Sequence, residues 1–240
     1  MKKIFLFTTA LIMLISCGRF MGKRIRGNGV IKTEERNVSP FKQVEASGAI
    51  KLMVSQGEFQ PVKLEGDENI LPYVEVNQSG ESIEIRTRPG YNISPSNDLI
   101  VYVTAPVYSS ISVSGASDIK GQNKITNSEN LELEASGAGD IEMDVDAPKL
   151  SAAISGSGSI RLKGQTKDLD INLSGAGHAY CYDLLSENAK VDISGAGSAE
   201  VYASMKLDAD VSGVGNVRYK GNASNVSQRV SGAGSVGKAE

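Results

Sequence analysis

The second half of the chain repeats a short glycine-rich tetrapeptide between stretches in which apolar and polar residues alternate. The tetrapeptide reads Ser-Gly-Ala-Gly with small variants, and it begins at Ser114, Ser136, Ser155, Ser174, Ser194, Ser212 and Ser231. The successive spacings are 22, 19, 19, 20, 18 and 19 residues. A nearly constant period of this size is typical of stacked structural units that share one continuous core.

The alternation within each unit follows the strand period of two. Counted from the serine, odd positions are mostly apolar, and the residue just before it is Val113, Ala135, Ile154, Leu173, Ile193, Val211 or Val230. Even positions are mostly polar, as at Glu132 and Asp170, four residues before their serines. A helix would need apolar residues at steps of three and four, which these positions do not supply. Each unit is therefore expected to contain short strands with one buried and one exposed face.

Such strands cannot bury their apolar faces within one unit, whereas stacked units can. Parallel pairing of neighbouring units, about 4.8 Å apart, would pile equivalent side chains into ladders inside the stack. We therefore predict an all-β, single-domain, right-handed parallel β-helix (β-solenoid) with about 19 residues per coil in the C-terminal half. The right hand is expected because strand twist favours right-handed parallel crossovers.

The glycines of the tetrapeptide are expected to form the corners of the coils. Gly137 and Gly139, like their equivalents, allow a positive φ and a sharp turn without a clash at Cβ. A phosphate-binding loop would need a helix to follow the glycines, and the sequence suggests none.

The front of the chain keeps the alternation without the tetrapeptide. We expect one solenoid domain over residues 29–240, with irregular capping coils at 29–110 and the repeats at 111–236, because end coils must differ from repeating ones. Ser47-Gly48-Ala49 looks like a degenerate first copy, and residues 67–72 indicate a short helical turn.

The first 16 residues resemble a lipoprotein signal peptide. Lys2 and Lys3 precede an apolar stretch, and Leu14-Ile15-Ser16-Cys17 resembles the bacterial lipoprotein box. Cys17 is then the expected site of lipid attachment, followed by a basic flexible tether over residues 17–28. The alternative is an ordinary cleaved signal peptide in which the cysteine occurs by chance. Because the residues after Cys17 are basic rather than acidic, we expect an outer-membrane lipoprotein at the periplasmic face rather than the cell surface.

Charge and cysteine content exclude several classes of protein. The formal net charge of −3 becomes about −5 once the leader with Lys2 and Lys3 is removed, and no basic stripe with interleaved aromatics indicates nucleic acid as a partner. Lipidation of Cys17 would leave Cys181 alone, so no disulfide framework is expected. Cys181 occupies an apolar column and is expected to be a small core residue.

Catalytic candidates are few. A polysaccharide lyase would need clustered carboxylates for calcium and a base. Asp144, Asp146, Asp168 and others fall mostly at even, solvent-facing positions, and the full set is Asp140, Asp144, Asp146, Arg161, Asp168 and Asp170. The only histidine, His178, also lies in a polar column. We therefore expect no enzyme and identify no catalytic, cofactor-binding or metal-binding residues.

Aromatic residues are concentrated in the front half, where they are expected to cap the open end of the solenoid. A carbohydrate-stacking platform is the sharper alternative. The loop Arg86-Thr87-Arg88-Pro89-Gly90-Tyr91-Asn92 offers two cations and an aromatic ring together, so Arg86, Arg88, Tyr91 and Asn92 form the candidate ligand surface.

Several segments together resemble one known family. They are the leader and lipobox, Arg36-Asn37-Val38-Ser39-Pro40-Phe41-Lys42-Gln43-Val44, Ser47-Gly48-Ala49 with Ile50-Lys51-Leu52, Leu64-Glu65-Gly66-Asp67-Glu68-Asn69, and the trailing Ser-Gly-x-Gly series. Over residues 29–236 the chain resembles the head GIN domain family, labelled auto-transporter adhesins and found widely in Bacteroidota. The resemblance implies a parallel β-helix and brings no catalytic residues.

Three hypotheses about function remain at this stage. The favoured one is a cell-envelope lipoprotein that acts as a non-enzymatic binding, adhesion or scaffolding module, with glycans or envelope proteins as partners. The first alternative is a carbohydrate-active enzyme, resembling a polysaccharide lyase or hydrolase, that uses one face of the solenoid. The second is a structural envelope protein that assembles with further copies of itself into homo-oligomers.

Overall fold

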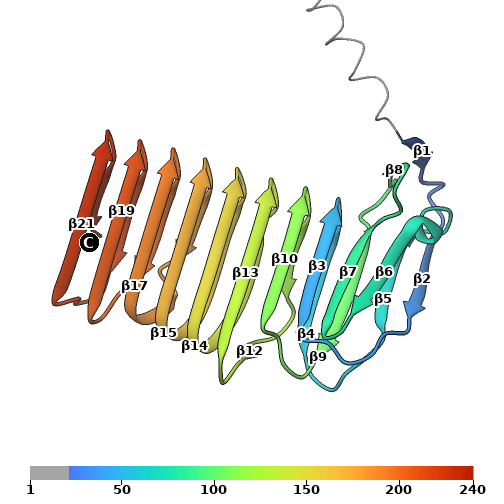
Figure 1. Cartoon of the computed structure of the whole chain (residues 1–240), viewed down its shortest axis with the longest axis horizontal. Helices are drawn as coiled ribbons and strands as arrows, with labels where there is room; N and C mark the ends of the chain where they lie inside the picture. The colour runs from blue at the N-terminus through green and yellow to red at the C-terminus, as the bar shows by residue number, and fades with distance from the viewer. Residues whose placement is uncertain (1–21, 240) are drawn as a thin grey trace, which may run out of the picture.

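The computed structural model describes residues 22–239, and these residues form a single stack of β-strands (Figure 1). No α-helix occurs in this part of the chain; a 3-10 helix, η2 (Leu71–Tyr73), is the helical turn expected at residues 67–72, displaced slightly toward the C-terminus. The leader and Cys17 lie outside the described residues.

The coils present two faces. In spatial order, the first face contains β7 (Ser82–Thr87), β3 (Gln43–Gly48), β10 (Ser110–Gly115), β13 (Asn130–Gly137), the second halves of β14 (Ile141–Gly156) and β15 (Ser159–Gly175), β17 (Leu184–Gly195), β19 (Lys206–Gly213) and β21 (Asn225–Gly232). The second face contains β9 (Ile100–Ala105), β4 (Lys51–Gln56), β11 (Asp118–Gly121), the first halves of β14 and β15, β16 (His178–Cys181), β18 (Ser198–Tyr202), β20 (Asn216–Lys220) and β22 (Ser235–Lys238). All of these strand pairs are parallel, so the β-solenoid prediction is confirmed.

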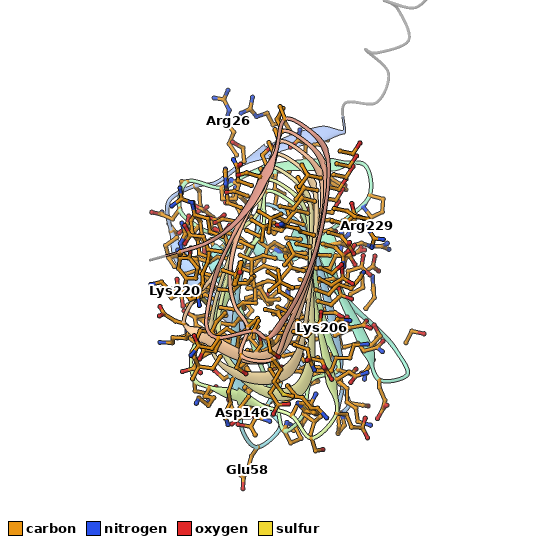
Figure 2. The ribbon with its side chains drawn as sticks, turned by 90° about the vertical axis from the view of Figure 1, so that its left-hand side faces the viewer. Arg26, Glu58, Asp146, Lys206, Lys220 and Arg229 are labelled. Atoms are coloured by element: carbon orange, nitrogen blue, oxygen red, sulfur yellow. The ribbon has the colours of Figure 1, made fainter. Side chains whose placement is uncertain are left out.

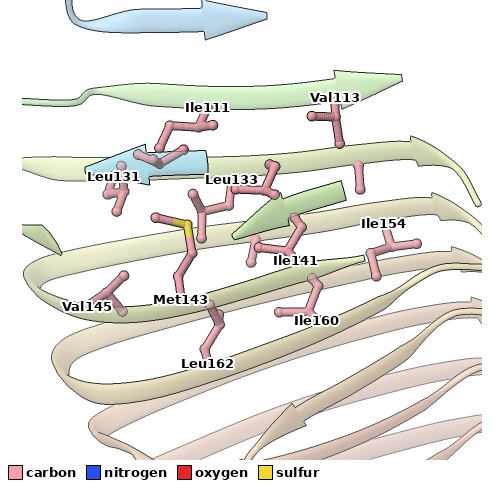
Figure 3. Packing of buried hydrophobic residues seen from close by; sticks show 14 of the residues in the cluster. Ile111, Val113, Leu131, Leu133, Ile141, Met143, Val145, Ile154, Ile160 and Leu162 are labelled. Carbon is pink, nitrogen blue, oxygen red and sulfur yellow. The ribbon is translucent and has the colours of Figure 1, made fainter. Parts of the chain in front are cut away.

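The register follows the repeat. Ser136 pairs with Ser155, and Ser155 pairs with Ser174, so each tetrapeptide lies directly over the next. The odd positions point inward and form one core, of which Figure 3 shows part; Ile141 and Ile160 are fully buried on adjacent coils. Charged side chains such as Lys220 and Arg229 project outward from opposite faces (Figure 2). The alternation read from the sequence therefore separates core from surface correctly.

The tetrapeptide glycines serve two distinct needs at the corners. Gly137 has φ +118°, and a Cβ there would lie 2.2 Å from the carbonyl oxygen of Gly115 on the preceding coil. Gly139 has no positive φ, but its Cβ would lie 1.9 Å from the carbonyl oxygen of Ser117. The first glycine is needed for conformation and close approach, the second for close approach alone.

The front end is folded back on itself rather than wound in chain order. β3 lies between β7 and β10, and Ser47 is in register with Ser114, which confirms the degenerate first copy. The outer end is closed by antiparallel strands: β6 (Val74–Ser79) on β7, and β2 (Ile31–Arg36) with β5 (Val62–Asp67) on β9. The expectation of irregular capping coils throughout residues 29–110 therefore needs correction: β2, β5 and β6 close the end by antiparallel pairing, whereas β3, β4, β7 and β9 continue the two parallel faces.

The expectation of a flexible tether through residue 28 requires correction. Residues Lys23–Arg26 form β1, which pairs in parallel with β8 (Tyr91–Ser94). The buried Asp67 carboxylate then accepts hydrogen bonds from the backbone N–H of Gly29 (2.7 Å) and of Ser96 (2.9 Å). Low apolar content suggested a linker, but a strand held by backbone hydrogen bonds and one buried carboxylate needs little apolar surface.

Candidate functional site

The second face carries a groove of about 380 Å³ that crosses four consecutive coils. We call it the Tyr180 groove. It is lined by Gln122, Asn123, Lys124, Glu142, Asp144, Arg161, Lys163, Tyr180 and Asp183, together with Gly121, Met143 and Leu162. Its volume falls within the range of small-molecule sites, roughly 300–1,000 Å³.

Two departures from the regular coil create the walls of the groove. Ile119 pairs with Ile141, 22 positions on, whereas Ile125 pairs with Val145, 20 positions on; two extra residues therefore bulge out between Lys120 and Ile125. This bulge carries Gln122, Asn123 and Lys124.

On the opposite side of the groove, the sequence separation between paired residues on adjacent coils increases from 19 to 20. Arg161 pairs with Tyr180, but Gly164 pairs with Leu184, so one extra residue is inserted before Leu184. The insertion forms the turn at Tyr182 and Asp183, and the backbone N–H of Gly164 donates to the Asp183 carbonyl (3.0 Å). The regular coils between the two bulges form the floor.

Tyr180 is the aromatic surface of the groove. It occupies an outward, normally polar position on β16 and remains 40% exposed. The Arg161 guanidinium lies 4.9 Å from the centre of its ring, a cation–π distance, and the His178 ring lies 6.2 Å away in a stacked orientation. These neighbours hold the ring in place while leaving part of it open to solvent.

The polar groups around Tyr180 are of both charge signs. Lys124 Nζ lies 3.6 Å from Asp144 Oδ1, and Lys120 Nζ lies 3.4 Å from Glu142 Oε2. Asp144 Oδ1 is buried and has no hydrogen-bond partner among the described residues. Exposed Lys163 adds a further donor. The groove therefore combines a partly open aromatic ring with hydrogen-bond donors and acceptors, which suits a neutral polyhydroxylated ligand with polarised C–H groups.

The carboxylates considered for lyase chemistry do not gather into one cluster. Asp140 accepts from the backbone and hydroxyl of Ser159 (2.8 and 2.7 Å), and Asp146 accepts from Gln165 (2.8 Å). Similar contacts engage the remaining two: Asp168 accepts from Asn188 and Asp170 accepts from Asn172. Only Asp144 and Arg161 of the candidate set line the Tyr180 groove. Within residues 22–239, no group of three or more His, Cys, Asp or Glu side chains is placed to hold a metal ion.

His178 and Cys181 lie where the alternation placed them. His178 is exposed and its Nδ1 lies 2.7 Å from Ser198 Oγ on the next coil. Cys181 is fully buried, and burial raises the pKa of its thiol to about 12. The thiol is thus kept protonated at neutral pH, as expected of a core residue.

The four residues of the sequence-based candidate surface lie at the capped end. Arg88 Nε is 2.9 Å from Glu75 Oε1, and Arg86 Nη1 is 3.1 Å from Glu84 Oε1. Tyr91 packs on Tyr73 with ring centres 4.5 Å apart, while Asn92 is exposed on β8. The Tyr91–Tyr73 contact packs β8 against the cap, both arginines are held in ion pairs, and a ligand surface there stays a prediction.

The sequence reasoning missed the Tyr180 groove because it assigned the aromatics to the front half. Two signals were present. Tyr180 stands in a column of outward, polar positions, and the coils of 22 and 20 residues depart from the common spacing at the places where the groove has its walls.

Several solved structures have a similar fold and share about a fifth of their residues with this chain. A "putative adhesin" from Bacteroides fragilis has a TM-score of 0.85 and 21% identity over 90% of this chain and 100% of its own. A "putative lipid binding protein" from Parabacteroides distasonis (TM-score 0.74, 22% identity) and a "putative adhesin" from Parabacteroides merdae (0.71, 22%) each cover 91% of this chain and 100% of their own. At this identity the likeness shows the shared fold.

Two further findings bear on classification. No helix within the described residues is both long and apolar enough to span a membrane. No protein of curated function matches the sequence. Residues 40–223, from just before β3 to the end of the penultimate coil, match the family described as "Putative auto-transporter adhesin, head GIN domain", and the chain belongs to that family.

Proposed function

We propose that this protein is a non-enzymatic adhesion module of the cell envelope, anchored by a lipid at Cys17, and that its Tyr180 groove binds carbohydrate. The family description supports an adhesin-type role at the envelope or cell surface. The lipobox at Leu14–Cys17 supports the anchor.

The observation that carries the carbohydrate proposal is the position of Tyr180. A ring that is 40% exposed, in register with the charged residues Arg161 and Glu200 on the neighbouring coils, has a cost in water that a stacked sugar ring would remove. Arg161 and Lys163 on one neighbouring coil can donate to sugar hydroxyls, and Asp144 and Asp183 can accept from them.

The rigid scaffold preorganises the groove for binding. The floor is a run of parallel strands whose inward residues Met143 and Leu162 are buried in the core. A ligand would therefore meet a surface already in its binding shape, so little ordering entropy would be lost on association.

A carbohydrate-active enzyme is the second candidate, because Asp144 and Arg161 line the same groove as Tyr180. A carboxylate and a cation beside a bound sugar could take part in cleavage of its glycosidic bond. Binding without release of product separates the adhesion module from the enzyme.

A glycan array tests the proposal. The chain from Gly22 onward, which contains every described strand, is applied with and without calcium, beside Tyr180→Ala. Tyr202→Ala is the matched control, because Tyr202 lies on the same face outside the groove. We expect saturable binding that Tyr180→Ala loses and Tyr202→Ala keeps. Equal binding by all three proteins would refute the site, and cleaved glycan in the supernatant would favour the enzyme.

A further inference from the structure

The two ends of the solenoid are built differently. At the N-terminal end, β2 carries charged residues along its edge, and Lys32 and Arg36 form ion pairs with Glu68 and Glu34. Charged edges of this kind prevent further strands from adding. At the other end, within the described residues, β21 pairs only with β19 and β22 only with β20 (Figure 1).

The last coil leaves part of the core open. Val226 and Val230 point inward in the columns of Leu207 and Val211, which are fully buried one coil earlier. Val226 is nevertheless 38% exposed and Val230 43% exposed, and every residue of β21 is exposed. Unpaired strand edges beside open apolar side chains are a template for another strand.

The sequence of β21 is self-complementary when it is read in the opposite direction. Val226-Ser227-Gln228-Arg229-Val230 is symmetric in its apolar and polar positions about Gln228. In an antiparallel pair centred there, Val226 would face Val230 of the other copy and Gln228 would face itself. Two identical strands related by a two-fold axis pair in this antiparallel way.

We propose that the chain forms a dimer by pairing the β21 edge with the same edge of a second copy, C-terminal end to C-terminal end. The paired valines would close the open cores of both copies, and the facing Gln228 amides can hydrogen bond to each other. Arg229 meets Ser227 rather than another charge, and it keeps its own pairing with Asp210 (3.2 Å).

Stacking of an end on the opposite end of another copy is disfavoured. It would bring the β21 edge against the free edge of β6 on the first face, and β22 against the charged edge of β2 on the second face, where Lys32 and Glu34 would lose water for no matching partner. The interaction is therefore expected to close at two copies rather than to continue as a filament.

The size of the contact predicts its strength. One coil edge, residues 222–238, contributes somewhat fewer residues than the roughly 20–30 that each partner supplies to a standard interface. We expect a reversible dimer that dissociates in the micromolar range, about 1–100 μM.

Sedimentation equilibrium of the chain from Gly22 onward tests the proposal. Wild type is expected to shift from monomer to dimer with concentration, and Val226→Lys is expected to stay monomeric because it puts a charge at the apolar contact. Leu185→Lys is the control: Leu185 is also exposed (52%) but lies on an earlier coil. Circular dichroism checks that each variant is folded.

A cysteine placed at the symmetry centre tests the register. Gln228→Cys would lie opposite itself, within the Cα separation of facing strand residues, about 4.5–5.5 Å, and is expected to form an intermolecular disulfide on mild oxidation. Ser227→Cys would face Arg229 of the second copy rather than the other introduced cysteine, so it is expected to crosslink far less. A wild-type monomer at all concentrations, or a dimer that survives Val226→Lys without crosslinking through Gln228→Cys, would overturn the proposal.

Discussion

Alanine substitutions at three glycines separate the two costs of a coil corner. Gly90 has φ +85° with no atom within 4 Å of an added Cβ, so Gly90→Ala incurs the conformational cost alone. Gly139→Ala incurs the steric cost alone, because its Cβ would lie 1.9 Å from the Ser117 carbonyl oxygen. Gly137→Ala incurs both, with φ +118° and a contact of 2.2 Å.

The magnitudes follow from the geometry. A left-handed alanine costs roughly 1–2 kcal/mol, which is the expected loss of unfolding free energy for Gly90→Ala. Overpacking costs about 1–3 kcal/mol, and Gly139→Ala should lie at or above the top of that range because a backbone carbonyl in a ladder cannot rotate away. Gly137→Ala should therefore lose about 3–5 kcal/mol in all.

Urea unfolding followed by circular dichroism measures the three values. The expected order of destabilisation is Gly90→Ala, then Gly139→Ala, then Gly137→Ala. If Gly137→Ala were no more destabilising than Gly90→Ala, the coils would not approach each other as closely at the tetrapeptide as the structure requires.

Three further predictions concern the corner, the cap and the anchor. Gly175→Val should destabilise far more than Asp170→Ala in thermal melts, because Gly175 has φ +111° and its Cβ would lie 2.5 Å from the Gly156 carbonyl oxygen, whereas Asp170 faces outward and accepts a hydrogen bond from the neighbouring Asn172. Burial acts to raise the pKa of Asp67, but the Ser96 hydroxyl and the N–H groups of Ser96, Gly29 and Asn97 outweigh it and leave that pKa below its usual value. The Asp67 carboxylate therefore stabilises the fold at pH values above its unfolded pKa of about 3.9, and this contribution is lost as the pH falls through the lower pKa of the folded state. The difference in unfolding free energy between wild type and Asp67→Asn should therefore shrink below about pH 4. A difference that grows on acidification would contradict this. Cys17→Ser should abolish incorporation of labelled fatty acid into the full chain and release it from membranes, and continued labelling would show that Cys17 is not the anchor.

The regular half of the fold could be predicted from sequence because each coil repeats the same local requirements. The odd-position columns identify buried residues such as Ile171 and Cys181, and the tetrapeptide identifies the corners. Two periods carry this information: the strand period of two sets which residues are buried, and the spacing of about 19 residues sets which residues stack on each other.

The front end and the groove depend on contacts that no periodicity reports. The insertion of β3 between β7 and β10, and the pairing of β1 with β8, join segments distant in sequence. The Tyr180 groove arises where coils are longer than their neighbours, so the irregular spacings, rather than the repeat, mark the candidate site.

A tryptophan placed in the groove tests the central proposal most directly. The chain contains no tryptophan, so Tyr180→Trp introduces a single fluorescent reporter at the proposed stacking surface. When a glycan that the wild-type chain retains on the array is titrated into Tyr180→Trp, the tryptophan emission should change saturably and no cleaved product should appear. The tryptophan emission of Tyr202→Trp should stay unchanged in the same titration. Unchanged Tyr180→Trp emission at glycan concentrations that saturate the chain would show that the sugar binds elsewhere.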